Sequence, residues 1–273
     1  MKFRVILHHL SLIIIGVGIA MLIPMMFSLI SGDGAATSFA GPVAFCLAGG
    51  ATVRLLTATK GHRLSTREAI LLVAVGWVFA SSVGALPYYL SGAVPTYIDA
   101  YFEAMSGFTT TGATVFTSIE TQHQSILLWR SVTQWLGGMG IIMLFVALFP
   151  VLGLGSAHLI EAEMPGSQHG ERLTARIRDS AKALWLIYLG MTITLYVLLR
   201  FAGLMPFDAV NISLTTMPTG GFAPTDLSIT SYNNIWVEII VTVFMVLAGG
   251  YFGLYYFLFY KRRPSYLFKN TEF

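Results

Sequence analysis

Long apolar segments alternate with shorter polar connections along the whole chain of 273 residues. A helix needs about 20 predominantly apolar residues to cross the hydrocarbon core of a bilayer, and six segments meet that length. The pattern therefore predicts an all-α integral membrane protein. The predicted spans cover residues 4–30, 36–57, 68–90, 125–150, 179–202 and 233–260.

The first segment has one feature of a signal peptide, because Lys2 and Arg4 precede its apolar stretch. However, the stretch from Leu10 to Ile30 is longer than the apolar region of a signal peptide, which usually has about 7–15 residues. It also lacks a clear cleavage site of the small-x-small type directly after it. We therefore expect a retained helix.

Composition supports a membrane protein and argues against several other classes. Hydrophobic residues make up 55% of the chain and charged residues only 11%, whereas a soluble domain has about 25% charged residues. The net charge of +3 gives no concentrated basic face, so no nucleic-acid partner is expected. The single cysteine, Cys46, excludes an intrachain disulfide. The six histidines show no metal-binding spacing, and no nucleophile–base set or phosphate-binding motif is present, so the chain is not expected to be an enzyme.

The basic residues predict the orientation of the spans. Connections rich in Lys and Arg stay in the cytoplasm by the positive-inside rule. Fourteen of the sixteen basic residues lie on one side of the predicted topology, so that side and both termini are expected to be cytoplasmic. The connections on the opposite side carry acidic residues and no Lys or Arg. The cytoplasmic basic residues are Lys2, Arg4, Arg54, Lys60, Arg63, Arg67, Arg172, Arg176, Arg178, Lys182, Lys261, Arg262, Arg263 and Lys269.

Two connections on the predicted outer side, residues 91–124 and 203–232, share an unusual plan. Each begins with a short apolar segment, from Tyr97 to Met105 in the first and from Phe207 to Leu214 in the second. Segments of two to three helical turns are too short to cross a bilayer. We therefore expect two re-entrant half-helices.

A Thr-Gly-rich stretch follows each predicted half-helix, so the chain holds an internal repeat of span, half-helix, Thr-Gly turn and span. Its period, taken from Gly112 to Gly220, is 108 residues. Both copies have the same orientation, unlike the inverted repeats of many secondary transporters. Thr-Gly stretches are ordinary loops in most proteins, but two copies at matching places favour a shared function.

Carbonyl oxygens of an extended Thr-Gly strand can replace the hydration shell of a cation. Non-helical backbone at membrane depth is tolerated where it lines water or is buried in protein. The negative end of each half-helix dipole would face the ion. The sequence therefore predicts cation coordination by neutral oxygens. The candidate ligands are Thr110, Thr111 and Gly112 in the first copy and Pro218, Thr219 and Gly220 in the second.

Polar residues and glycines inside the spans suggest supporting roles. Arg130 lies about a turn inside the fourth span. Its side chain either snorkels to the outer interface or pairs with Glu103 and supports the candidate ion ligands, which together would form a selectivity filter. Glu238, in the sixth span, is a candidate polar brace. Two glycine clusters indicate either close helix packing or a hinge behind the pore. These clusters are Gly137, Gly138 and Gly140 in the fourth span and Gly249, Gly250 and Gly253 in the sixth.

Three stretches, residues 102–114, 129–140 and 219–222, resemble the filter loops and the adjoining helix of the Trk/Ktr/HKT superfamily. The first two spans match the additional N-terminal helix pair of its bacterial Trk-type members. The resemblance implies potassium uptake with K⁺ at the filter residues, including ion-coupled symport among the expected mechanisms. It also implies a multi-pass protein of the bacterial inner membrane, in contact with lipid. The implied partners are a second copy, forming a homodimer, and a cytoplasmic nucleotide-binding regulatory subunit.

Members of this family carry four such repeats, and these 273 residues hold two. The third and fourth filter loops are absent from them, as are the gate helix and the intramembrane arginine of the family. A truncated form, a gene fragment and a natural half-length form stay open. So do a secondary transporter of another small solute and a non-conducting scaffold. The expected domains are a helix pair (1–67), a first repeat (68–150), a cytoplasmic linker (151–178), a second repeat (179–260) and a basic tail (261–273).

Overall fold

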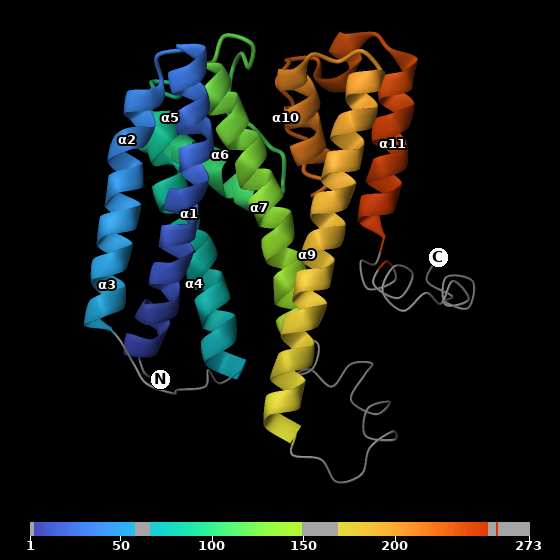
Figure 1. Cartoon of the computed structure of the whole chain (residues 1–273). Coiled ribbons are helices and arrows are strands. Elements are labelled where there is room, and N and C mark those ends of the chain that lie inside the picture. Colours follow the sequence, from blue (N-terminus) through green and yellow to red (C-terminus); the bar gives the residue numbers. More distant parts are fainter. Residues whose placement is uncertain (1–2, 58–65, 149–168, 251–254, 256–273) are drawn as a thin grey trace.

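The structure is a computed structural model that describes residues 3–57, 66–148, 169–250 and 255. Within these ranges the chain is helical and has no β-strand. Figure 1 shows most of the helices running along one common direction. The predicted all-α membrane fold is confirmed. The helices are α1 (Phe3–Ser31), α2 (Ala36–Ala44), the π-helical η1 (Phe45–Gly49), α3 (Gly50–Leu56), α4 (Thr66–Gly84), α5 (Leu86–Leu90), α6 (Tyr97–Phe108), α7 (Gln124–Leu148), α9 (His169–Phe201), α10 (Pro206–Thr216), the 3-10 turn η2 (Ser228–Tyr232) and α11 (Ile235–Gly249).

Among the described residues, four stretches are long and apolar enough to cross a bilayer, and they correspond to the first, second, third and fifth predicted spans. Helix α7 covers the fourth predicted span with 25 residues, although the side chains of 141–148 lie outside the described residues. Helix α11 covers part of the sixth with 15 residues. The four spanning stretches are Phe3–Ser31, Ala36–Leu56, Ile70–Leu90 and Ala181–Phe201.

The sixth predicted span, 233–260, is wrong as one uninterrupted helix. Helix α11 ends at Gly249, and Gly250 is extended with ψ of 163°. Two successive glycines are poor helix formers, since each costs about 1 kcal/mol relative to alanine. Of the two readings of this glycine cluster, the structure favours an unwound point at Gly250. Gly253 and the predicted basic tail lie outside the described residues.

The helix that contains the fifth predicted span extends into the predicted linker. Helix α9 begins at His169, ten residues before the expected start at 179. The stretch from 171 to 182 is rich in Glu, Arg, Ala and Lys, which are strong helix formers in water. Hydropathy identifies only the apolar part of such a helix, and that part, Ala181–Phe201, agrees with the predicted span of 179–202. The rest of the predicted linker, 151–168, lies outside the described residues.

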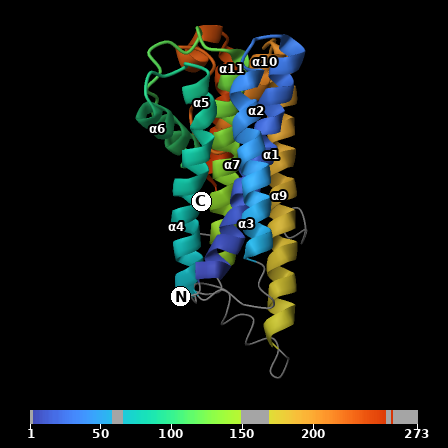
Figure 2. The ribbon, with the colours of Figure 1, turned by 90° about the vertical axis from the view of Figure 1, so that its left-hand side faces the viewer.

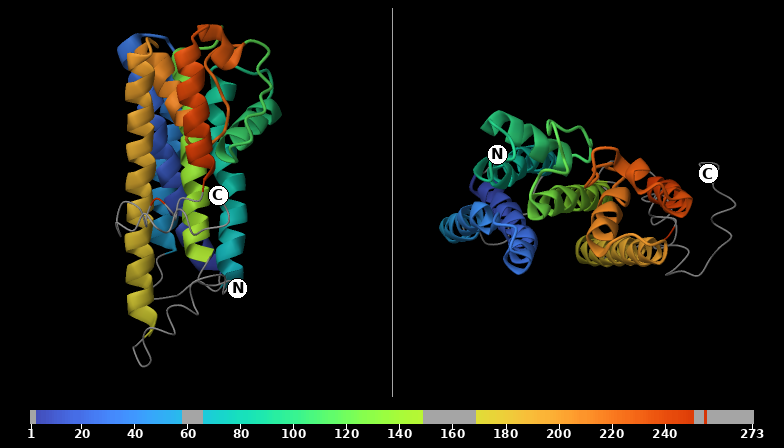
Figure 3. Two further views of the ribbon diagram at one scale, coloured as in Figure 1. Left: turned by 90° about the vertical axis from the view of Figure 1, so that its right-hand side faces the viewer. Right: turned by 90° about the horizontal axis from the view of Figure 1, so that it is seen from above.

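Helix α7 lies between two groups of helices, as the view from above in Figure 3 shows. One group contains α1 to α6 and has a hydrophobic core around residues such as Phe39, Tyr88 and Trp129. The other contains α9 to α11 and has a core around Tyr188, Leu199 and Phe244. Because α7 packs against both short helices, α6 and α10, it connects the two groups.

The leading helices are held to each other and to α7. A Cβ on Gly18 would lie 2.6 Å from the Cys46 Cβ, so the helices cross closely at that point. In the turn after α1, Asp33 accepts the Ser28 hydroxyl and the N–H of Ser125, at 2.8 Å. Burial alone would raise the pKa of Asp33, but these hydrogen bonds and that from the Ala35 N–H lower it. The Asp33 carboxylate therefore fastens the leading pair to the start of α7.

Candidate ion-filter loops

The two short helices begin at the same end of the molecule, as Figures 1 and 2 show for α10 and α6. Thr96 caps α6 by accepting the Asp99 N–H at 3.1 Å, and α10 starts with Pro206. Asp99 and Asp208 lie in the first turns of α6 and α10, where a negative charge complements the helix dipole. The carbonyl ends of both helices therefore point to the stretches that follow, which we term the first loop (residues 109–123) and the second loop (residues 217–234).

Both helices end with the same hydrogen-bond pattern. In the first loop the Thr111 N–H donates to the Ser106 carbonyl, and in the second the Gly220 N–H donates to the Thr215 carbonyl. Each of these bonds encloses a residue with positive φ, Thr110 at 57° and Thr219 at 54°. This is a Schellman ending, in which the left-handed residue is usually glycine. A β-branched residue in that conformation costs about 1–3 kcal/mol, and both loops carry the cost at the same place.

This pattern corrects the alignment of the two copies. Because Thr111 matches Gly220, the period is 109 residues rather than 108. Gly112, with φ of 76°, consequently matches Gly221, with φ of 80°. The match of Gly112 with Gly220 was wrong because the second loop contains two adjacent glycines. Only the backbone conformation, with a positive φ at Gly221 and not at Gly220, shows which of the two glycines matches Gly112.

The structure places the candidate ligands of the first loop on its open side, since Thr111 is exposed and Thr110 and Gly112 are partly exposed. The candidates of the second loop divide. Thr219 is exposed, whereas Pro218 and Gly220 are buried. Gly221, which the sequence did not single out, is exposed at the position that matches Gly112.

Pro218 occupies the place of Thr109 at the end of the helix rather than the place of a Thr-Gly residue. Its ring packs on α7, since a Cβ on Gly138 would lie 2.5 Å from the Pro218 Cβ. Its carbonyl accepts the Thr219 hydroxyl at 2.7 Å. These contacts give Pro218 a packing position.

The two loops touch each other at Gly112 and Gly220. A Cβ on Gly112 would lie 2.0 Å from the Gly220 carbonyl oxygen, a distance that no side chain tolerates. The absence of a side chain therefore lets two segments from distant parts of the sequence come together.

Glu103 organises the first loop from within α6, where it is fully buried. Its carboxylate accepts the Thr114 hydroxyl at 3.0 Å and the Val115 N–H at 3.0 Å. On the other side of Thr114, the Ser106 hydroxyl donates to the Ala113 carbonyl at 2.6 Å. Two side chains of α6 thus hold residues 113–115 of the first loop.

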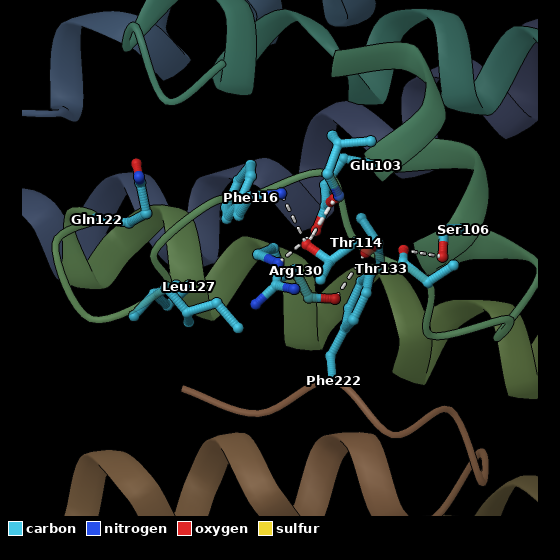
Figure 4. Close-up of polar contacts among 12 residues, drawn as sticks. Glu103, Ser106, Thr114, Phe116, Gln122, Leu127, Arg130, Thr133 and Phe222 are labelled. Atoms are coloured by element: carbon cyan, nitrogen blue, oxygen red, sulfur yellow. Dashed lines mark hydrogen bonds and ion pairs between the residues drawn. The ribbon is translucent and has the colours of Figure 1, made fainter. Parts of the chain in front are cut away.

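Arg130 pairs with Glu103 in the structure, through an Nε–Oε1 contact of 2.7 Å with side-chain exposures of 2% and 0%. Its Nη1 also donates to the Ala223 carbonyl of the second loop at 3.2 Å. The guanidinium lies over the rings of Phe222, at 4.0 Å, and Phe116, at 4.9 Å. Figure 4 shows Arg130 between Glu103 and Phe222. The snorkelling alternative is wrong, because the charge is buried and paired between the two loops.

Sequence reasoning missed Gln134, which lies one turn beyond Arg130 on α7. It is fully buried. Its Nε2 donates to the Gly220 carbonyl at 2.9 Å, and its Oε1 accepts the Phe222 N–H at 3.1 Å. Burying a side-chain amide inside an apolar span costs free energy unless the amide is hydrogen-bonded. A glutamine within the fourth predicted span was therefore the signal in the sequence for buried hydrogen-bond partners.

The glycines of α7 are packing positions rather than a hinge, because the helix continues past them to Leu148. A Cβ on Gly137 would lie 2.1 Å from the Phe108 carbonyl oxygen, and one on Gly140 would lie 3.1 Å from Trp77. Glu238 does not brace the helices described here, since it is exposed in the first turn of α11.

Contacts further along the two loops also join them. Asp226 of the second loop accepts the N–H of Ile119 in the first loop at 2.6 Å, and its own N–H donates to Glu120 at 3.3 Å. The two loops are therefore connected at three levels, by Gly112 with Gly220, by Arg130 and by Asp226.

Comparison with known proteins places this architecture in a family. The model of the TrkH family, described as cation transport proteins, matches residues 36–272. The chain belongs to the TrkH family. The Trk system potassium uptake protein TrkH of Escherichia coli K12 is 37% identical over the whole chain, which spans 57% of that protein. The TrkG protein of the same organism is 33% identical over 98% of the chain and 56% of its own length.

A crystal structure of the potassium transporter TrkH from Vibrio parahaemolyticus has the same fold, with a TM-score of 0.88 and 34% identity. The comparison covers the whole of this chain and 55% of that one. The chain thus spans just over half the length of the TrkH-family relatives that it matches.

Proposed function

We propose that this chain contributes two filter loops to a pore for potassium uptake. The observation that carries the proposal is the pair of loops with the same backbone conformation, which meet at Gly112 and Gly220. Each follows a short helix whose carbonyl end faces it, and each presents exposed backbone next to a glycine with positive φ. Such backbone offers neutral oxygens to a weakly hydrated cation. The potassium uptake activity named for the relatives agrees with this chemistry.

The candidate ligands are the backbone oxygens around Thr110, Thr111 and Gly112 and around Thr219 and Gly221. Gly220 is a weaker candidate than the sequence suggested, because its carbonyl already accepts the Gln134 amide. Glu103 and Arg130 support the loops without touching the ion. A complete ring requires further loops, from the remainder of a longer chain or from another copy.

The wider proposal follows the family. The chain divides into the leading helix pair, a first helix–loop–helix unit and a second one. The transported ion is K⁺. We also propose that the protein lies in the bacterial inner membrane, forms a homodimer and binds a cytoplasmic nucleotide-binding subunit. No catalytic group is needed, because coordination makes and breaks no covalent bond.

A chimera tests the function. This chain replaces the matching part of the Escherichia coli TrkH protein, and the chimera is expressed in a host that lacks potassium uptake. We expect growth at low potassium and rubidium uptake that sodium competes with only weakly. The matched control carries Gly112→Ser. A chimera that inserts into the membrane without selective uptake would contradict the proposal and favour a scaffold, and uptake of another solute would favour a secondary transporter.

Orientation is tested separately by cysteine substitution. We expect impermeant thiol reagents to label cysteines at Ser118 and Ser231 from outside, and not a cysteine at Ser167. The native Cys46 is buried and serves as an internal blank. Labelling of position 167 alone would reverse the proposed topology.

A further inference from the structure

Gln134 holds the second loop on both sides of Gly221. Because the Gly220 carbonyl can only accept and the Phe222 N–H can only donate, the amide has one possible orientation, with Nε2 toward Gly220. A neighbouring parallel strand would use the same two groups of the loop. One side chain of α7 thus takes the place of a neighbouring strand, an element that is absent from the part of the chain that the structure describes.

This pairing determines where the Gly221 carbonyl points. The carbonyl of Gly221 and the N–H of Phe222 belong to one planar, trans peptide group, in which they point in opposite directions. The N–H points to Gln134, which is buried. The Gly221 carbonyl therefore points away from α7, on the side where Gly221 itself is exposed.

We propose that Gln134 is a positioning residue that acts across the two halves of the chain, aiming the Gly221 carbonyl of the second loop at the ion path. The inference rests on the proposed potassium pore. It goes beyond that function because it assigns control of the second loop to a helix of the first unit. Different side chains hold the backbone of the first loop. Ser106 donates to the Ala113 carbonyl, and Glu103 accepts the Val115 N–H.

Substitutions at Gln134 separate positioning from packing. Gln134→Met keeps the volume and removes both hydrogen bonds, whereas Gln134→Glu keeps the acceptor for the Phe222 N–H. Ser131→Ala is the matched control, because Ser131 is buried one turn away and bonds Asn211 of α10 at 2.6 Å rather than a loop. All three are made in the chimera described above.

The first measurement is discrimination, taken as rubidium uptake under sodium competition. Leaving buried polar groups unpaired costs enough to expect about a tenfold loss in Gln134→Met. Gln134→Glu should retain more discrimination than Gln134→Met, and Ser131→Ala should retain all of it. Equal losses in Gln134→Met and Ser131→Ala would overturn positioning in favour of a general packing effect.

The second measurement does not depend on transport. Amide hydrogen exchange of a peptide spanning 217–224 should be at least about tenfold faster in Gln134→Met, with exchange of 109–115 unchanged. Unchanged exchange in the second loop would overturn the inference, as would faster exchange with full discrimination. If Gln134→Met does not fold, Gln134→Glu and the same two measurements decide. Failure of the unsubstituted chimera to select potassium would instead remove the proposed function, and exchange would still test the Gln134 contacts.

Discussion

The first and second loops reach the same conformation with different support. The first is held by its own short helix, through Glu103 and Ser106. The second is held by α7, which lies far from it in the sequence, through Gln134 and Arg130. At the position in α10 that matches Glu103 there is Ile212, which is buried and apolar. A repeated backbone therefore does not imply repeated side-chain support.

The difference also orders the assembly of the two loops. We expect the first loop to form once α6 and α7 have packed, because Glu103 and Ser106 lie on α6 and Glu103 pairs with Arg130 of α7. The second loop lacks most of its partners until α10 has packed on α7, which provides Gln134 and Arg130. Substitutions in α7 should consequently affect both loops, and substitutions in α6 mainly the first.

The largest expected effect is that of Gly112→Ser. A side chain there meets the Gly220 carbonyl oxygen at 2.0 Å and also has to adopt φ of 76°. Gly221→Ser meets no neighbouring atom, since nothing lies within 4 Å of the added Cβ. It suffers only from the positive φ, which should lower stability by about 1–3 kcal/mol. We expect Gly112→Ser to lose more thermal stability and more sodium discrimination than Gly221→Ser.

Gly220→Ser should fall between these two, because its side chain would meet the flexible Gln134 at 2.4 Å. Thermal denaturation in detergent and sodium competition of rubidium uptake provide the ranking. Equal behaviour of Gly112→Ser and Gly221→Ser would show that the loops do not touch as described.

Breaking the buried ion pair is expected to have the next largest effect. Removing one partner leaves a buried charge unpaired, at a cost of about 3–5 kcal/mol. Glu103→Leu and Arg130→Met should each lower the melting temperature, and the double variant should cost less than the sum. Arg130→Met should also loosen the second loop, through the lost bond to the Ala223 carbonyl. Additive losses in the double variant would argue against direct coupling.

Packing behind the loops should respond more moderately. Gly137→Ala places a Cβ 2.1 Å from the Phe108 carbonyl oxygen, and overpacking of this kind costs about 1–3 kcal/mol. Gly190→Ala is the matched control in a helix, since nothing lies within 4 Å of it. The control should be neutral or slightly stabilising in thermal denaturation. A neutral Gly137→Ala would mean that α7 does not pack on the end of α6.

The smallest effect is expected at the two left-handed threonines. Thr110→Gly and Thr219→Gly relieve the strain of positive φ and should stabilise the chain by up to about 1 kcal/mol, less the backbone entropy of glycine. Discrimination should fall at the same time, because the loop becomes more adaptable. Thr109→Gly is the control: Thr109 has φ of −84° and gains nothing from glycine. Destabilisation by Thr110→Gly, measured as a lower melting temperature, would contradict the strain argument.

The sequence predicted the helices better than the contacts between them. The half-helix expected from Tyr97 begins at Tyr97, and the one expected from Phe207 begins at Pro206, because apolar length and helix caps are local signals. The register of the loops depends on which carbonyl each N–H finds, and two adjacent glycines give no local means to choose. Gln134 was missed for a related reason, since its partners lie 86 and 88 residues further along the chain.

The contact of Gly112, Gly220 and Gln134 also governs how segments can be exchanged between related proteins. A side chain on Gly112 overlaps the Gly220 carbonyl, and one on Gly220 overlaps Gln134. None of the three can therefore be replaced without disturbing another, although they lie far apart in the sequence. If the second loop alone were transferred from a relative, its backbone would meet an α7 and a first loop whose side chains do not fit it. Exchange should succeed only when the first loop, the middle of α7 and the second loop move together as one unit.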